Sequence, residues 1–329
     1  MRHHTLQLLI TCSLLVLGGC RMTDTKPNKS AVGDPYDMFI ICDNDAWADR
    51  NLSLTVCDLF EEDVPGMKRH EGYFNIVKQA DPDKVTEIDY KSSNIFRVSI
   101  DPTFTSPTTG ITTDVYGYPQ TIVTVHAPST TVAAEYIRLS APELRYIFEQ
   151  AERDRRVSEV RSSHDKTLST EFEEHTGYNM LIPKGYQKAG TRDKELLWYI
   201  LNGEKMARYI FAFSYDYTSE WDLTAEGITM QTDAMLTTIP GEAEHSFMKI
   251  DERGPAILTK RNIAGRLWYE VRGWWDVAND YMGGIYASYT TLDEATQRLT
   301  TILFGVYAPD EGSHLEYIRG MEHLIFTIK

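Results

Sequence analysis

The residue types best suited to binding chemistry lie in one aromatic stretch, RLWYEVRGWWDVANDYMGGIY, at residues 266–286. Indole rings stack on sugar rings and on cations, and carboxylates accept hydrogen bonds from a ligand. Side chains alternate along a strand, so Arg272 and Trp274 would share one face and Trp275 would lie on the other. The first face is expected to carry Trp268, Glu270, Arg272 and Trp274, and the second Leu267, Tyr269, Val271 and Trp275.

This stretch is the candidate site for a ligand or a protein partner, and its two glycines would make the following loop flexible. The alternative is that the aromatic rings pack in the core and that Arg272 pairs with Glu270 or Asp276, because aromatic strand residues mostly pack. The candidate binding residues are Arg272, Trp274, Trp275, Asp276, Asp280, Gly283 and Gly284.

Asp43 and Asp45 form a weaker alternative, an acid pair directly after the apolar run YDMFIIC. The pattern resembles the acid pair of haloacid-dehalogenase-type phosphotransferases, in which one Asp attacks phosphorus and the other acts as an acid. Trp47 replaces the Thr or Val of that pattern, and no downstream Lys or acidic metal pair matches it. Trp47 also lacks the ligand oxygen that a calcium loop needs at this position. The alternative is that both carboxylates cap the helix that follows.

No other reactive group of residues stands out in the sequence. Ser163-His164-Asp165-Lys166 contains S-x-x-K, but the companion motifs of penicillin-recognising enzymes are missing. The nine histidines show no metal-binding spacing, and no nucleophile-elbow, phosphate-loop or dinucleotide motif occurs. We therefore predict no catalytic residue, no metal and no cofactor, and favour a non-enzymatic protein.

The N-terminus indicates where the protein works. Leu6 to Leu17 is a run of twelve mostly apolar residues after Arg2, which is shorter than the ~20 that a membrane helix needs. A basic start, a short apolar run and small residues are typical of a signal peptide. Leu17-Gly18-Gly19-Cys20 resembles the lipobox of bacterial lipoproteins, which implies cleavage before Cys20 and acyl chains on that residue. The alternative is an ordinary signal peptide followed by a chance cysteine.

Lipidation would hold the protein on a membrane without crossing it, because two or more acyl chains anchor a protein firmly. Arg21 replaces the Asp that often signals inner-membrane retention, and no acidic run follows Cys20. We therefore expect a lipid-anchored protein of the cell envelope, on the outer membrane and facing the periplasm. Its expected partners are that membrane, through Cys20, and an envelope protein or a small ligand.

The acidic composition argues against nucleic acid as a partner, and two of the cysteines could form a disulfide. Removing residues 1–19 takes away Arg2 and moves the formal net charge from −15 to −16. A chain this acidic is not expected to bind nucleic acid, which needs clustered Lys and Arg. In an oxidising envelope Cys42 and Cys57 could form a disulfide. The alternative is that each is a small buried apolar residue, one at a strand end and one in a helix.

The alternation of short strands and helices predicts an α+β fold with two related halves and mainly antiparallel sheets. The second half is expected to be richer in strands, and a long charged helix that begins near Pro142 would join the halves. The expected strands are 36–42, 94–100, 120–126, 179–182, 196–201, 207–214, 256–260, 265–275, 284–290 and 298–307, the expected helices are 46–60, 222–239 and 313–326, and residues 101–119 are expected to be a loop.

The expected domain organisation includes an internal repeat. Val-His-Ala-Pro at 125–128 and Glu-Tyr-Ile-Arg at 135–138 return as Val-Tyr-Ala-Pro at 306–309 and Glu-Tyr-Ile-Arg at 316–319, with the same offset. The alternative is coincidence between two ordinary strand-to-helix turns. The predicted boundaries are a signal peptide at 1–19, a flexible tether at 20–35, a first half at 36–176 and a second half at 177–329.

Several short motifs together point to a family. They are the lipobox, Asp43-x-Asp45-x-Trp47, Val64-Pro65-Gly66, Asn94-Ile95, Ala127-Pro128, Glu152-Arg153, Ile239-Pro240-Gly241, Arg272-Gly273-x-Trp275, Asp280-x-Met282-Gly283-Gly284 and Val306-Tyr307-Ala308-Pro309. With these motifs the chain resembles, over nearly all of its mature length, an uncharacterised family of Gram-negative lipoproteins known as the domain of unknown function DUF4837. In that family Pro usually follows the two glycines, where this chain has Ile285. The family has no known activity, so the resemblance implies no catalytic residue.

Three functions remain open from the sequence alone. The first is a lipid-anchored envelope protein that binds a ligand or partner through the Arg272–Gly284 region. The second is an envelope hydrolase or phosphotransferase-like enzyme that uses Asp43 and Asp45. The third is a structural scaffold of the periplasm with no pocket near either group of residues.

Overall fold

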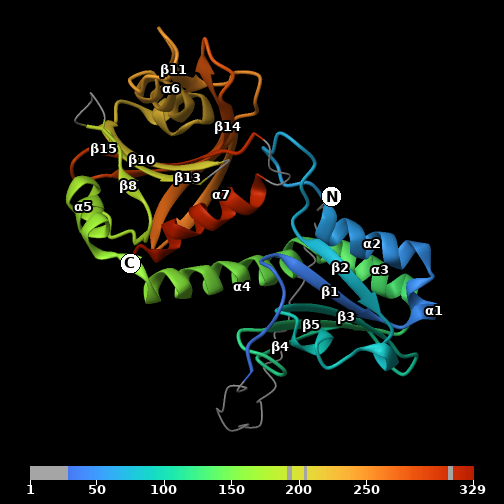
Figure 1. Ribbon diagram of the computed structural model, residues 1–329. Helices are drawn as coiled ribbons and strands as arrows, with labels where there is room; N and C mark the ends of the chain where they lie inside the picture. The colour runs from blue at the N-terminus through green and yellow to red at the C-terminus, as the bar shows by residue number, and fades with distance from the viewer. Residues whose placement is uncertain (1–28, 191–194, 204–205, 310–313) are drawn as a thin grey trace, which may run out of the picture.

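The computed structural model describes residues 29–190, 195–203, 206–309 and 314–329. Two β-sheets, each with its own helices, form two halves that are joined by one long helix, α4 (Figure 1). The second half has the larger sheet. The expected α+β fold with two halves, the second richer in strands, is therefore confirmed. The predicted signal peptide and the lipidation residue Cys20 lie outside the described residues.

The first half is built on a five-stranded sheet with the strand order β2-β1-β3-β5-β4. Strands β2, β1, β3 and β5 run parallel to one another, and β4 pairs antiparallel with β5. Antiparallel pairs dominate the molecule as a whole, but this sheet departs from that expectation because α2 carries the chain back from the end of β1 to the start of β2. The strands are β1 (Asp37–Cys42), β2 (Asn75–Ala80), β3 (Asn94–Ile100), β4 (Thr108–Thr113) and β5 (Thr121–Ala127).

Four α-helices belong to the first half or leave it. Polar side chains begin them: the Asp49 carboxylate accepts a hydrogen bond from the Asn51 N–H at the start of α2, and the Ser129 hydroxyl accepts one from Val132 at the start of α3. Their apolar sides cover one face of the sheet, where Phe60, Phe96 and Phe148 pack edge to face. The helices are α1 (Asn44–Trp47), α2 (Arg50–Glu61), α3 (Thr130–Leu139) and α4 (Ala141–Ser162), with 3₁₀ turns η1 (Pro82–Lys84) and η2 (Asp89–Lys91).

Part of the predicted tether is fixed to the first half. The Ala31 N–H donates to the Tyr118 carbonyl at 3.0 Å, and the Val32 N–H donates to the Lys91 carbonyl at 2.9 Å. Ala31 approaches so closely that a Cβ on Gly117 would lie 2.9 Å from its Cα. The prediction of a flexible tether up to residue 35 is therefore wrong for residues 30–32.

The second half contains an eight-stranded sheet, in which every pairing is antiparallel. Its strand order is β11-β13-β14-β15-β10-β9-β8, and β12 pairs with β13 beside β11. The strands are β8 (Gln187–Lys188), β9 (Leu197–Asn202), β10 (Ala207–Asp216), β11 (Phe247–Ile250), β12 (Ile257–Ile263), β13 (Arg266–Ala278), β14 (Gly283–Asp293) and β15 (Arg298–Tyr307), and β6 (His164–Asp165) pairs with β7 (Ile182–Pro183) as a separate small sheet.

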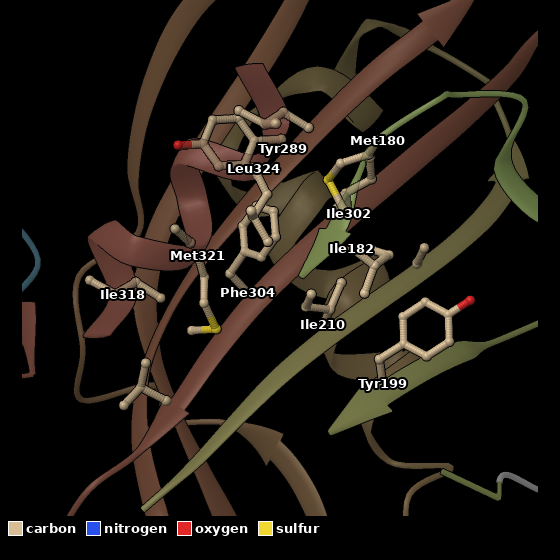
Figure 2. Close-up of a cluster of buried hydrophobic side chains, with 14 of the residues drawn as sticks. Met180, Ile182, Tyr199, Ile210, Tyr289, Ile302, Phe304, Ile318, Met321 and Leu324 are labelled. Carbon is tan, nitrogen blue, oxygen red and sulfur yellow. The ribbon is translucent and has the colours of Figure 1, made fainter. Parts of the chain in front are cut away.

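Helices cover both faces of this larger sheet. On one face α5 (Lys166–Thr176), α7 (Leu315–Glu322) and the 3₁₀ turn η4 (His323–Thr327) enclose a core that includes Ile210, Tyr289 and Phe304 (Figure 2). On the other face lie η3 (Glu220–Leu223) and α6 (Ala225–Leu236), over a second cluster around Phe211, Trp275 and Leu303. The sheet is therefore a layer between two separate apolar cores.

The boundary between the halves and the repeat both differ from expectation. Phe172 of α5 is fully buried in the core of the second half, so α5 belongs there and not to a first half that ends at residue 176. The repeated motifs do form equivalent local structures, since β5 leads into α3 and β15 leads into α7. The sheets around them differ, one mainly parallel and one antiparallel, so the two halves do not share a topology.

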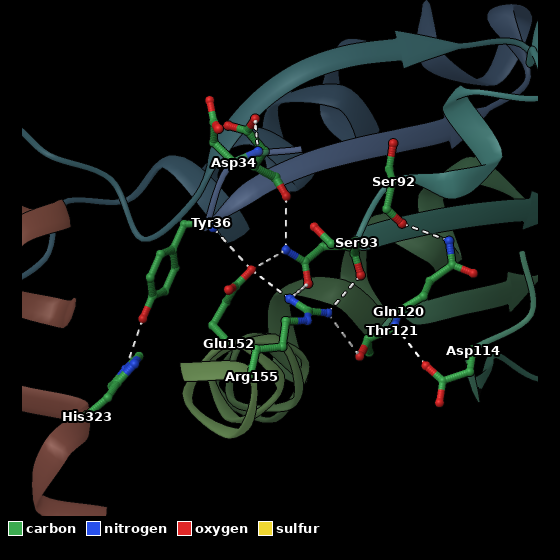
Figure 3. Close-up of polar contacts among 12 residues, drawn as sticks. Asp34, Tyr36, Ser92, Ser93, Asp114, Gln120, Thr121, Glu152, Arg155 and His323 are labelled. Atoms are coloured by element: carbon green, nitrogen blue, oxygen red, sulfur yellow. Dashed lines mark hydrogen bonds and ion pairs between the residues drawn. The ribbon is translucent and has the colours of Figure 1, made fainter. Parts of the chain in front are cut away.

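A buried polar network ties α4 to the start of the first sheet (Figure 3). The Glu152 carboxylate accepts hydrogen bonds from the Tyr36 N–H at 3.1 Å, from the Asn94 amide at 2.6 Å and from the Arg155 guanidinium at 2.7 Å. The Tyr36 hydroxyl in turn contacts Nε2 of His323 in the second half at 3.0 Å. Tyr36 has a φ of +66°, a left-handed conformation that costs energy in a non-glycine residue. Asn94 and Glu152, two of the motif residues, therefore meet at the joint between the halves.

Candidate functional sites on the two faces of strand β13

Strand β13 carries most of the predicted binding residues, and its side chains alternate as the sequence predicts. Trp268 belongs to the core on the α7 side, and Trp274 packs against it. Val271, Trp275 and Val277 belong to the cluster on the α6 side. The candidate binding residues are therefore divided between the two faces of the sheet. Arg272 and Trp274 face the first half, whereas Trp275 lies on the α6 side.

Arg272 is the centre of a buried ion-pair network on the α7 side. Its Nε donates to Glu270 at 2.6 Å and its Nη2 donates to Glu322 at 2.7 Å. The Glu270 and Glu322 side chains are 2% and 6% exposed. Arg261 also donates to Glu270 at 2.7 Å, and the two arginines hold the pKa of Glu270 below its ordinary value despite the burial of its carboxylate. The alternative pairing of Arg272 with Glu270 is thus confirmed.

Trp274 is part of the contact between the two halves, and its indole ring is not free to bind a ligand. Its indole N–H donates to the Gly66 carbonyl at 2.9 Å, and the ammonium group of Lys68 lies 5.3 Å from the ring centroid. Gly66 has a φ of +89°, and a Cβ there would lie 3.1 Å from the Cβ of Arg272. The Val64-Pro65-Gly66 motif therefore forms the part of the first half that packs on β13.

A small polar pocket lies beside Arg272, between the halves, and we call it the inter-half pocket. Its volume is about 170 Å³. Residues of the first half, of α4, of strands β12 to β14 and of the C-terminal helices line it. They are Tyr36, Val64, Pro65, Tyr73, Tyr146, Glu149, Gln150, Arg153, Ile257, Thr259, Arg261, Glu270, Arg272, Tyr289, Arg319, Glu322, His323 and Phe326.

A larger and more apolar cavity opens on the opposite face of the sheet, and we call it the Trp275 pocket. Its volume is about 600 Å³. Aromatic rings and three methionine thioethers supply much of its lining, and Glu242 is the single charged residue among the described lining residues. The lining residues are Trp198, Ile200, Asn202, Gly203, Met206, Ala207, Tyr209, Ile239, Pro240, Gly241, Glu242, Met248, Trp275, Val277, Met282, Tyr307 and Pro309.

Gly284 allows Trp275 to form the floor of this pocket. A Cβ on Gly284 would lie 1.8 Å from the Val306 carbonyl oxygen and 2.8 Å from Nε1 of Trp275. Because glycine has no Cβ at this position, the Trp275 indole lies across β14 and its N–H donates to the Val306 carbonyl at 3.2 Å. Gly283 also faces Trp275, since a Cβ there would lie 2.9 Å from the Trp275 carbonyl oxygen. Gly284 therefore makes room for the indole ring of Trp275, and Gly283 makes room for the backbone of Trp275.

A row of aromatic rings extends from Trp275 across the pocket. Tyr209 meets Trp275 edge to face at 5.7 Å between centroids, and Trp198 lies 6.3 Å from Tyr209. Burial, with the nearby Tyr307 and Glu242, raises the pKa of Tyr209 to about 12, so its hydroxyl stays neutral. The buried indole N–H of Trp198 has no hydrogen-bond partner among the described residues. The wall thus offers apolar surface and one unsatisfied donor.

The remaining predicted binding residues stay outside both pockets. Asp276 lies 3.4 Å from the guanidinium of Arg253 and pairs with that residue, not with Arg272. Asp280 accepts a hydrogen bond from the Tyr281 N–H in the turn between β13 and β14, and Tyr281 is fully exposed. The prediction that Asp276 and Asp280 join Arg272 in one surface is therefore wrong, because Asp276 pairs with Arg253 and Asp280 lies in the turn beyond β13.

Asp43 and Asp45 occupy the start of α1. The Asp43 carboxylate accepts a hydrogen bond from the Asp45 N–H at 2.9 Å, as the capping alternative predicts. Both side chains are exposed, and no group of three or more His, Cys, Asp or Glu side chains suited to a metal occurs in the described part of the chain.

The disulfide considered for Cys42 and Cys57 is not formed, and both are free thiols. Cys42 points into the core of the first half, whereas Cys57 lies on α2 outside the apolar cluster formed by Val56, Leu59 and Phe60. Burial raises the pKa of the Cys42 thiol to about 12, with Asp43 and Asp81 adding to the shift. Cys42 is therefore the buried residue at a strand end that the alternative predicts, whereas Cys57 lies in a helix as predicted but is only half-buried.

Several residues of the two pockets have no signal in the sequence. Trp198, Tyr209 and Met248 come from β9, β10 and β11, which are distant from the predicted motif in sequence and reach Trp275 only through strand pairing. Glu149 and Glu322 come from α4 and α7, whose amphipathic patterns show a buried face but not its partner. Finding these residues requires the order of the strands in the sheet and the packing of the helices on it.

Two family profiles match the chain, and both are described as domains of unknown function. DUF8532 matches residues 31–161, and DUF4837 matches residues 165–327. The junction falls at the end of α4, where the structure also separates the halves. No curated protein matches the chain. Among the described residues no helix is both long and apolar enough to span a bilayer. The second half is therefore a DUF4837 domain, and a DUF8532 domain precedes it in the first half and α4.

Proposed function

We propose that this protein is a lipid-anchored lipoprotein of the bacterial cell envelope that binds a small apolar ligand in the Trp275 pocket. Its anchor is the diacylglyceryl group and the N-acyl chain expected on Cys20. These chains would hold the protein on the outer membrane, with its folded part facing the periplasm. The observation that supports binding is the pocket of about 600 Å³ with its aromatic floor. This volume lies within the range of small-molecule sites, which are mostly lined by apolar side chains.

The chemistry of the lining narrows the class of ligand. Met206, Met248 and Met282 adapt to different shapes, because thioether side chains are unbranched and polarizable. Glu242 at the rim disfavours an anion, so a fatty acid is a poor fit. The unpartnered Trp198 N–H favours a ligand with a hydrogen-bond acceptor. A neutral or cationic molecule with an apolar body and one acceptor oxygen or nitrogen meets all three conditions.

Dye binding with a matched pair of variants tests the proposal. The neutral apolar dye N-phenyl-1-naphthylamine should gain fluorescence on binding to the full chain. Met282→Glu places a charge in the pocket and should abolish this gain, whereas Met230→Glu, on an exposed part of α6, should leave it unchanged. Equal fluorescence from the two variants would exclude the Trp275 pocket as the binding site.

The anchor has its own test. Cys20→Ser removes the thiol that would carry the lipid, so the protein should move from the membrane fraction to the soluble fraction of the envelope. Mass spectrometry of the native product should find acyl chains on Cys20. An unmodified Met1, or a Cys20→Ser protein that stays with the membrane, would contradict the anchor without affecting the binding test.

An enzyme that uses Asp43 and Asp45 is the second candidate, and one observation favours it. Asp43 follows β1 at the point where the strand order turns from β2 on one side to β3 on the other. Open sheets with parallel strands commonly bind ligands at this position. Asp43→Asn should then abolish phosphate release from 4-nitrophenyl phosphate, and absence of turnover in the unmodified protein would rule this candidate out.

A further inference from the structure

The inter-half pocket carries an inference independent of the Trp275 pocket. It lies on the other face of the sheet, and the residues lining it belong to a different set. Its lining includes four arginines and three glutamates, which leaves one net positive charge (4 − 3) when all are ionised. They are Arg153, Arg261, Arg272, Arg319, Glu149, Glu270 and Glu322.

Arg272 has one nitrogen that the protein leaves unused. Nε and Nη2 bond to Glu270 and Glu322, but the buried Nη1 has no partner among the described residues. A buried donor on a charged group is costly when it has no acceptor. Glu270 and Glu322 do not accept a bond from Nη1, because Glu270 accepts from Nε of Arg272 and from Arg261, and Glu322 accepts from Nη2 of Arg272.

Two further guanidinium groups are held in place by aromatic rings. Arg319 lies 4.0 Å from the centroid of Tyr36 and donates from Nη1 to the Tyr73 carbonyl at 2.7 Å. Arg153 lies 4.4 Å from the centroid of Phe326. Stacking fixes the plane of a guanidinium and keeps its edge free to donate, and a guanidinium edge matches a carboxylate with two parallel hydrogen bonds.

Glu149 is the acid of the pocket that has no bond to an arginine. No hydrogen bond or ion pair ties its carboxyl to the described residues around it. Burial raises the pKa of Glu149 above its ordinary value, although the surrounding arginines oppose that shift.

We propose that the inter-half pocket binds a small organic acid, whose carboxylate accepts hydrogen bonds from Nη1 of Arg272 and from Arg319. One net positive charge suits a monoanion, and a volume of about 170 Å³ suits an acid of a few heavy atoms. Because the pocket is lined by both halves and by α4, bound acid would also strengthen the contact between the halves.

Acetate is the probe for this proposal. Saturation transfer from the full chain to the acetate methyl group should be measured by proton NMR, with chloride balancing the ionic strength. Gln150→Glu adds a negative charge to the lining without removing a described contact, and it should weaken acetate binding at least tenfold. Ser158→Glu adds the same charge to an exposed position on the same helix and should leave binding unchanged.

Arg272→Lys gives the second test, because it keeps the charge but loses Nη1. Acetate binding should fall at least tenfold in this variant, provided that circular dichroism shows a native fold, and Gln150→Glu remains the deciding variant if it does not. Absence of saturation transfer to acetate, equal binding by Gln150→Glu and Ser158→Glu, or tighter binding of inorganic phosphate than of acetate would each overturn the proposal. None of these results depends on dye binding in the Trp275 pocket.

Discussion

The two faces of strand β13 start from similar residues and end in different surroundings. On the α7 side, Trp274 bonds to the Gly66 carbonyl of the first half, and Arg272 bonds to Glu322 within the second half. On the α6 side, Trp275 bonds within its own sheet and leaves its ring beside a cavity of about 600 Å³. Neighbouring indoles on one strand therefore have separate roles, which are set by what packs against each face.

Breaking the buried ion pair on the α7 side should have the largest effect. Glu322→Gln leaves part of the Arg272 charge without a partner, and removing one member of a buried pair costs about 3–5 kcal/mol of unfolding free energy. Urea denaturation, followed by circular dichroism, measures this loss.

An exposed ion pair of the same sheet provides the control for Glu322→Gln. Asp216 pairs with Arg298 at 3.1 Å, and their side chains are 79% and 44% exposed. Asp216→Asn should cost no more than about 1 kcal/mol, because water screens the pair. Equal losses from the two variants would show that the pair of Arg272 and Glu322 is no more buried than the exposed pair.

Filling the space beside Trp275 tests the other face. Gly284→Ala places a methyl group within 1.8 Å of the Val306 carbonyl oxygen, so β14 or the indole must move, at about 1–3 kcal/mol. Gly320→Ala is the control, because a Cβ there meets no atom within 4 Å and alanine favours a helix. Thermal unfolding should separate the two variants. A Gly284→Ala protein as stable as the unmodified one would contradict the floor assigned to Trp275.

The joint between the halves should also respond to acid through His323. Burial and the neighbouring Arg319, Arg153, Arg156 and Arg272 lower the pKa of His323 to about 3, compared with about 6.5 in an unfolded chain. The folded state therefore excludes a proton that the unfolded state binds. Stability from this group is present above pH 6.5 and is lost as the pH falls, by about 1.4 kcal/mol for each pH unit.

Comparison with a variant isolates that contribution. In His323→Phe the loss of stability between pH 6.5 and 5 should be smaller than in the unmodified protein, as measured by urea denaturation at each pH. Glu149 acts in the opposite direction, since its pKa is raised, but it is present in both proteins. Parallel profiles for the two proteins would show that His323 titrates normally at the joint.

Local features of the fold could be predicted from the sequence because local chemistry determines them. The apolar run before Cys42, the β-branched run at Asn94 and the turn at Ala127-Pro128 mark β1, β3 and the end of β5. The alternation along β13 follows from strand geometry alone. Strands β2 and β4 were missed, because polar residues such as Lys78 and Thr112 face outward on exposed edges.

The sites could be predicted only in part, because they depend on contacts between distant segments. Sequence reasoning placed Arg272 and Trp275 on opposite faces of one strand but assigned both to one binding region, since nothing local shows that α7 covers one face and α6 the other. It treated Gly284 as a source of flexibility, whereas its role depends on Val306 across the sheet. Strand direction was missed for the same reason, because the crossover through α2 is a matter of three-dimensional packing.

Labelling all six tryptophans with 5-fluorotryptophan tests the division of β13 into two faces most directly. Fluorine NMR can follow the signals while N-phenyl-1-naphthylamine is added. We expect the signals of Trp198 and Trp275 to shift with dye concentration, and those of Trp268 and Trp274 to stay in place. A shift of Trp274 as large as that of Trp275, or a Trp275 signal that does not move, would contradict the account.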